Sequence, residues 1–201
     1  MDDGKEGKGE LIGYSATPES FYYSETEKTP GDGTGQFLGT IDPKDNSGKN
    51  FLNDLIKEDP SLETYLPNTV GGEKYDFKTT NGTDKVQFTT NEDKYRGMPI
   101  LGDKNGKPIF ASARDVGNIG AGLVAGKDGM SWSTARLGFD GLESYQQSGF
   151  SSESSSTQFG QKLGHRIGSQ MYLKFKASRL PGNGHLRSTT ISKDVVKRKD
   201  L

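Results

Sequence analysis

The sequence predicts an α+β domain that is mainly α-helical, with a core of three to four helices and a small antiparallel β-hairpin layer. Apolar residues recur every three or four positions through most of the second half of the chain, as on one face of a helix. Glycines at four-residue spacing in the last of these segments indicate close helix packing. Alternating polar and apolar residues around Asn-Gly pairs predict hairpins in the middle of the chain.

The first predicted helix begins near residue 47. Phe51, Leu52, Leu55 and Ile56 fall at helical spacing, Ser47 is a candidate N-cap, and a proline four residues after the last of them ends the helix.

Two hairpins are predicted to follow. Residues 75–79 alternate between polar and apolar side chains, and the alternation resumes over 86–88 after Asn81-Gly82. The second hairpin pairs residues 98–101 with 108–110. Together the two hairpins would form a small antiparallel layer.

Three longer helices are expected over residues 112–125, 132–147 and 157–180. In the last helix, Gly160, Gly164 and Gly168 form a stripe that allows another backbone to approach closely. The expected partner is the small-residue face of helix 112–125, which contains Ala113, Gly117, Gly120, Ala121 and Ala125.

Composition limits the classes of function. The 201 residues include 29% hydrophobic and 26% charged side chains, with a mean hydropathy of -0.79. The chain has no cysteine and only two histidines, which excludes thiolate chemistry and argues against a histidine zinc site, so no metal or cofactor is expected. No apolar run is long enough to span a membrane, and no signal peptide is visible after Met1.

Charge is divided between the two halves of the chain. Residues 1–100 carry 19 acidic and 11 basic side chains, whereas residues 101–201 carry 8 and 15. Residues 1–47 are predicted to be an acidic linker or loosely attached arm, and residues 48–201 a single domain with a basic C-terminal tail. The basic half suggests an anionic partner such as RNA, and the alternatives are a solvated helix face or shielding by the acidic half.

Two polar groups are the main candidates for a catalytic site. On the predicted strand, Asp76 and Lys78 would project from the same face about 7 Å apart, where they could orient a substrate and stabilise an anionic oxygen. At the start of helix 112–125, Asp115 and Asn118 share a face by their i, i+3 spacing, beside Arg114 as a candidate substrate-binding residue. The alternatives are a surface ion pair for the first group and helix capping for the second.

Weaker candidates lie toward the C-terminus. In a glycine-rich turn, His185 could serve as the base in phosphodiester cleavage, and Arg187 could bind the substrate and stabilise the charged transition state. Glu143 is a candidate acid, with a solvated helix face as the alternative, and His165 is interpreted as structural. The sequence contains no phosphate-binding loop, zinc-protease motif or nucleophile elbow.

A family resemblance accompanies these motifs. The order Tyr75-Asp76-Phe77-Lys78, then Asp115-x-Gly117-Asn118, then Gly122 is similar to the C-terminal domains of bacterial Rhs proteins, and in particular to polymorphic toxin type 44. The resemblance covers roughly residues 70–147, with Tyr75 where tryptophan is expected and a longer insertion between the motifs. It implies a hydrolytic effector of bacterial competition, delivered to a target cell and paired with an immunity protein, with a site formed by Asp76, Lys78, Asp115 and Asn118.

The sequence therefore predicts a toxin effector that cleaves RNA. One alternative is a peptidoglycan hydrolase that uses Glu143 and Asp115 as paired carboxylates. The other is a non-enzymatic interaction module whose glycine faces mediate assembly.

Overall fold

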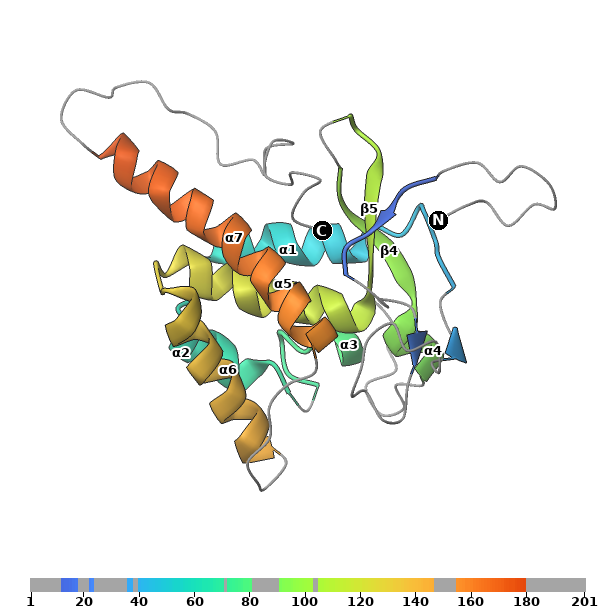
Figure 1. Cartoon of the computed structure of the whole chain (residues 1–201), viewed down its shortest axis with the longest axis horizontal. Coiled ribbons are helices and arrows are strands. Elements are labelled where there is room, and N and C mark those ends of the chain that lie inside the picture. The colour runs from blue at the N-terminus through green and yellow to red at the C-terminus, as the bar shows by residue number, and fades with distance from the viewer. Residues whose placement is uncertain are drawn as a thin grey trace.

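Helices dominate the part of the chain that the computed structural model describes, which comprises residues 12–17, 22–23, 36–37, 40–70, 72–80, 91–102, 105–146 and 155–179. This confirms the predicted α+β, mainly helical class (Figure 1). The helices are α1 (Ser47–Glu58), α2 (Leu62–Tyr65), η1 (Leu66–Asn68), α3 (Phe77–Thr80), α4 (Asn91–Tyr95), α5 (Ala113–Lys127), α6 (Trp132–Gln146) and α7 (Ser155–Ser178). The strands are β1 (Tyr14–Ser15), β2 (Tyr22–Tyr23), β3 (Gln36–Phe37), β4 (Gly97–Gly102) and β5 (Pro108–Ser112).

Helix α5 is the centre of the fold, and α7 crosses it at very short distance (Figure 1). A methyl group added to Gly164 would lie 2.8 Å from the backbone nitrogen of Leu123, and one added to Gly122 would lie 2.7 Å from that of His165. Real Cβ atoms do not approach backbone so closely, so only glycine permits this crossing. The predicted close packing of helix 112–125 against the glycine stripe of the last helix is confirmed.

The face of α5 that makes this contact differs from the predicted one. Gly122 and Gly126 face α7, whereas Gly120 faces α1 and α2, with its added Cβ 2.8 Å from Phe51 and 2.9 Å from the Tyr65 hydroxyl. Gly117 has no atom within 4 Å of such a Cβ. Because α5 is covered on several sides, its small residues serve several contacts rather than one stripe.

The main sheet has three strands in the order β1-β5-β4. Strands β4 and β5 are antiparallel, with Met98 opposite Ala111 and a register shift between Pro99 and Leu101, which confirms the second predicted hairpin. Ile100, Ile109 and Ala111 are buried against the helices. Ser112 ends β5 and caps α5, where its hydroxyl accepts a hydrogen bond from the Asp115 backbone N–H at 3.3 Å.

The first predicted hairpin is wrong over residues 75–79. Tyr75, Asp76 and Phe77 are all buried, and Phe77–Thr80 form the short helix α3, whose Thr80 N–H donates to the Asp76 carbonyl at 2.9 Å. The alternation extends over only a few residues, and packing of Tyr75 on Tyr65 and of Phe77 on Phe51 overrides it. Asn81-Gly82 and residues 86–88 lie outside the described residues.

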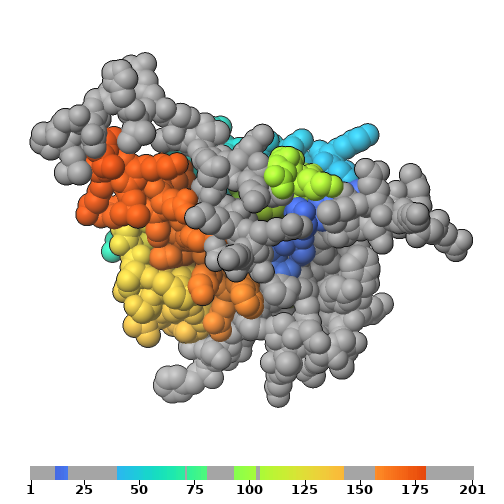
Figure 2. Space-filling view, turned by 45° about the horizontal axis from the view of Figure 1, so that its top comes forward, coloured from blue at the N-terminus to red at the C-terminus, as the bar shows by residue number. Residues whose placement is uncertain are grey.

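Part of the expected arm is built into the domain. Strand β1 pairs in parallel with β5, with Tyr14 opposite Ile109, and both Ala16 and Thr17 are buried. Figure 2 shows residues 12–17 (blue) beside the β4–β5 hairpin (green). The folded domain therefore includes residues before 48, since β1 is a strand of its main sheet. The expected basic tail beyond Arg179 lies outside the described residues.

None of the described helices combines the length and the apolar composition that a membrane crossing requires.

Candidate active site

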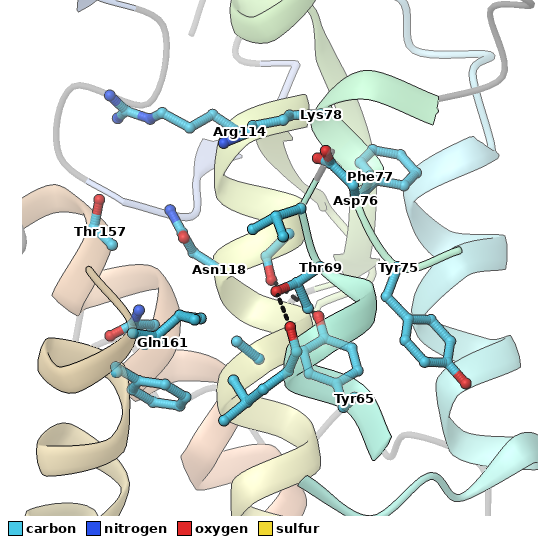
Figure 3. Close-up of a pocket in the computed structure, with 16 residues that line it drawn as sticks. Tyr65, Thr69, Tyr75, Asp76, Phe77, Lys78, Arg114, Asn118, Thr157 and Gln161 are labelled. Carbon is cyan, nitrogen blue, oxygen red and sulfur yellow. Dashed lines mark hydrogen bonds between the residues drawn. The ribbon is translucent and has the colours of Figure 1, made fainter. Parts of the chain in front are cut away.

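A cavity of about 230 Å³ lies between α5, the loop that leads into α3, η1, and the facing ends of α6 and α7 (Figure 3). Tyr65, Phe139 and Leu142 are among its apolar lining residues. Its charged and amide side chains are Asp76, Lys78, Arg114, Asn118 and Gln161. Four of the eight residues that the sequence predicted for a site thus line one cavity.

One face of α5 forms a wall of this cavity. Arg114, Gly117, Asn118 and Ala121 follow the spacing i, i+3, i+4, i+7, which places them along one side of a helix. Since a Cβ on Gly117 would meet no atom within 4 Å, this wall has open space at its centre.

Asp76 is held in place by its two aromatic neighbours. Tyr75 stacks on Tyr65 with ring centroids 5.0 Å apart, and Phe77 packs on Phe51 at 4.8 Å. Asp76 is only 4% exposed, and its Oδ2 accepts a hydrogen bond from the Gly72 backbone N–H at 3.0 Å. Among the described residues, its second oxygen, Oδ1, has no hydrogen-bond partner.

A polar cluster ties the same segment to α1. The Tyr75 hydroxyl donates to Glu58 Oε2 at 3.0 Å, and the Lys74 ammonium lies 2.8 Å from the same oxygen. The hydrogen bond from Lys74 lowers the pKa of Glu58, and the pKa of Lys74 is raised by the same contact. Burial, followed by the hydrogen bond to Glu58, raises the pKa of Tyr75. Tyr75 is therefore a neutral, oriented anchor beside Asp76.

Two further polar groups at the cavity have no partner within the described part of the chain. The exposed Lys78 ammonium forms no ion pair with any described residue, and the half-buried Asn118 amide forms no hydrogen bond with one. Figure 3 shows Lys78 and Arg114 at the same end of the cavity and Asn118 pointing into it from α5. Polar groups at a partly closed site need partners, which water or a ligand would supply.

Arg114 lines the cavity as a held cation. Its Nε donates to Asp115 Oδ1 at 3.3 Å, and its Nη1 donates to the Tyr95 hydroxyl at 3.1 Å. The guanidinium also lies 5.0 Å from the centre of the Tyr95 ring, in cation–π contact. Its charge is thus placed by two neighbouring side chains.

The structure does not bring Asp115 to the cavity. Its side chain has no solvent exposure, and its Oδ2 accepts a 2.6 Å hydrogen bond from Thr17. The i, i+3 spacing suggested a shared face with Asn118, but the cavity face of α5 includes Arg114, the i−4 neighbour of Asn118, instead. Asp115 is in the first turn of α5, where its negative charge interacts favourably with the positive end of the helix dipole.

Helices α6 and α7 supply the opposite wall. Gln161 is 2% exposed, and its Oε1 accepts a 2.6 Å hydrogen bond from Arg136, which also pairs with Asp140. Thr157 lies one turn before Gln161 on the cavity face of α7. Sequence analysis missed Gln161 and Tyr95, although the i, i+4 pair Thr157/Gln161 beside the glycine stripe was a usable signal.

The other predicted residues stand apart from this cavity or outside the described part. His185, Arg187 and the side chain of Glu143 lie outside the described residues. His165 lies on α7 with Nε2 2.8 Å from the Met130 carbonyl oxygen and its ring edge-on to Trp132, in agreement with a structural histidine.

Comparisons with known proteins identify no relative. No family model matches the chain, and no curated protein or solved structure matches it either. Function therefore has to be argued from the site. Among the described residues, no group of three or more histidine and acidic side chains is placed to hold a metal ion.

The polar groups of the cavity, which are two cations, one carboxylate and two amides, limit the reactions that it can support. The cations and amide N–H groups can bind an oxyanion, and a carboxylate with an unpartnered oxygen can accept a proton. The lining includes Asp76 as its sole carboxylate among the described residues, whereas glycoside hydrolysis ordinarily uses a pair. The arrangement suits the transfer of a phosphoryl group better than the cleavage of a sugar bond.

Proposed function

We propose that the chain is a bacterial toxin effector that cleaves RNA at this cavity. The observation that carries the proposal is the meeting of Asp76, Lys78 and Arg114 on a cavity of about 230 Å³. Phosphate contacts dominate the binding of proteins to nucleic acids, and the basic second half of the chain supplies further attraction. Action in a competing cell, and neutralisation by an immunity protein, belong to the same proposal.

The proposed step begins with Asp76 accepting the proton of a ribose 2′-hydroxyl. The 2′ oxygen then attacks the adjacent phosphorus, and the bond from phosphorus to the 5′ oxygen of the next nucleotide breaks. Lys78 gives a proton to that leaving oxygen. Arg114 binds the non-bridging oxygens of the phosphate, and Asn118 stabilises the charge that develops on them. The products are a 2′,3′-cyclic phosphate and a 5′-hydroxyl.

The test measures cleavage of a single-stranded RNA oligonucleotide by the full chain and by three variants. Asp76→Asn keeps an oxygen for the Gly72 N–H but removes the base, and a loss of roughly 10²- to 10⁴-fold is expected. Lys78→Met should lose about 10²-fold or more. Lys57→Met, which changes an exposed lysine of α1 paired with Asp54, is the matched control and should keep full activity.

The substrate separates this mechanism from its rivals. An oligonucleotide with 2′-deoxyribose at every position should resist cleavage because it lacks the attacking hydroxyl. Cleavage of that oligonucleotide at the RNA rate, or release of fragments from cell-wall sacculi with RNA left intact, would overturn the proposal. Expression in the bacterial cytoplasm should arrest growth for the wild type and not for Asp76→Asn.

A further inference from the structure

The hydrogen bonds around Arg114 extend beyond the cavity to the start of the chain. Its guanidinium is held by the Tyr95 hydroxyl on one side and by the Asp115 carboxylate on the other. The carboxylate is itself held by the Thr17 hydroxyl at 2.6 Å, across 98 positions of sequence. Neither Thr17 nor Asp115 lines the cavity.

We propose that Thr17 and Asp115 are positioning residues that hold Arg114 in place for the substrate phosphate. The inference deepens the proposed function and rests on it. Because Thr17 lies two residues after the end of β1, pairing of that strand with β5 delivers the hydroxyl to the carboxylate. Residues 12–17 then contribute to the site, although they are far in sequence from the residues that line the cavity.

Burial makes this arrangement specific. Thr17 is 2% exposed and Asp115 has no exposure, so neither group has water as a substitute partner. A carboxylate that accepts from both a hydroxyl and a guanidinium has a fixed orientation, and a bidentate or stacked arginine cannot be replaced by lysine without loss of that geometry. The Tyr95 ring limits the remaining freedom of the guanidinium through its cation–π contact.

A strand and a side chain thus act together. The Ala16 backbone N–H donates to the Phe110 carbonyl at 2.8 Å, which fixes the chain one residue before Thr17. Gly13 makes this approach possible, because a Cβ there would lie 2.5 Å from both the Phe110 ring and the Pro108 carbonyl oxygen. Residues 12–17 are therefore placed by contacts that are independent of the cavity, as a positioning element requires.

The test compares Thr17→Val, which removes only the hydroxyl from a side chain of nearly the same shape, with Thr17→Ser, which keeps it. In RNA cleavage, Thr17→Val should raise KM about 10-fold or more with kcat changed less than about twofold, because the binding cation is misplaced. Thr17→Ser should restore the wild-type KM. Loss of folded protein alone would instead lower kcat and leave KM unchanged, and that result would overturn the proposal.

A second measurement reports on Arg114 without RNA. The Arg114 Nε–H, bound to Asp115, should give a discrete NMR resonance that shifts on titration with inorganic phosphate. The resonance should broaden or move in Thr17→Val and in Tyr95→Phe, which removes the other anchor, and both variants should bind phosphate several-fold more weakly. An unchanged resonance and unchanged phosphate affinity in both variants would overturn the positioning role. If the wild type cleaves no RNA but these resonance changes occur, the proposed function fails, whereas the positioning of Arg114 by Thr17 and Asp115 is supported.

Discussion

The crossing of α5 and α7 makes Gly164→Ala the sharpest perturbation of the fold. The added methyl would lie 2.8 Å from both the Ile119 carbonyl carbon and the Leu123 nitrogen, and the Ile119 carbonyl oxygen is closer still. All three are backbone atoms of a helix and cannot rotate away. The two helices therefore have to separate, since carbon contacts favour about 3.5–4.0 Å.

The cost follows from two opposed effects. Overpacking a well-filled contact costs about 1–3 kcal/mol and occasionally more, and a separation of 0.5–1 Å also forfeits roughly a quarter to a half of each dispersion contact along the crossing. Replacing a mid-helix glycine by alanine stabilises the helix by about 1 kcal/mol, because alanine has the higher helix propensity. We expect a net loss of about 1–3 kcal/mol in the free energy of unfolding, or a fall in Tm of roughly 3–10 °C.

The chain offers a matched control on the facing helix. Gly117→Ala is the same substitution on α5, but its Cβ meets no atom within 4 Å. This variant should gain up to about 1 kcal/mol from helix propensity alone. Urea unfolding followed by circular dichroism measures both. If Gly164→Ala is as stable as the wild type, or if the two variants shift stability in the same direction, the close crossing of α5 and α7 is refuted.

Three further predictions follow from buried and ionisable groups. Asp115→Asn should lower the free energy of unfolding by about 3–5 kcal/mol, because it leaves Arg114 without its buried counter-charge; an unchanged urea midpoint would contradict the buried pair. Burial raises the pKa of Tyr65, so above pH 10 this residue ionises in the unfolded chain and keeps its proton in the folded chain. The free energy of unfolding should therefore fall as pH rises above about 10, and it should fall less steeply in Tyr65→Phe. Equal slopes in the two proteins would refute the raised pKa of Tyr65. The lowered pKa of Glu58 stabilises the folded chain at pH values above the ordinary pKa of 4.5, and this stability is lost as pH falls through the pKa of the folded state. Glu58→Gln should reduce this dependence on acid in urea midpoints measured between about pH 6 and 3. The same pH dependence in both proteins would count against the lowered pKa.

The long helices could be predicted because their patterns persist over several turns. The helices at 112–125 and 132–147 agree with α5 and α6 to within a residue or two at each end, and the glycine stripe correctly predicted that α5 and α7 approach closely. The pattern did not reveal which glycines of α5 take part. A helix covered on several sides has small residues all round, and the sequence carries no label for the partner of each face.

Structure that depends on short patterns, or on pairing between distant segments, could not be predicted from the sequence. The alternation at Tyr75, Phe77 and Thr79 covers too few residues to outweigh aromatic packing on Tyr65 and Phe51. The docking of β1 depends on a parallel pairing with a strand more than 90 positions away, for which residues 12–17 contain no local signal.

The candidate site shows the same division. Asp76, Lys78, Arg114 and Asn118 could be selected as polar side chains near short motifs, and the structure places all four on one cavity, although their catalytic role stays a prediction. Asp115 was selected by the same reasoning and is buried elsewhere, because helical spacing alone does not show whether a first-turn carboxylate faces a cavity or the protein interior.

Stability and site geometry depend on the same helix pair. Asn118 faces the cavity from α5, and Gln161 faces it from α7, so the separation of the two helices sets the distance between these side chains. Gly160 lies at this end of the crossing, and a Cβ on it would be 3.1 Å from the Cβ of Asn118. A glycine contact is well suited to such a role, because backbone packed on backbone has no rotamer to change and holds the spacing rigidly. The unusual glycine content of α5 and α7, which weakens each helix in isolation, is then what fixes the width of the cavity between them.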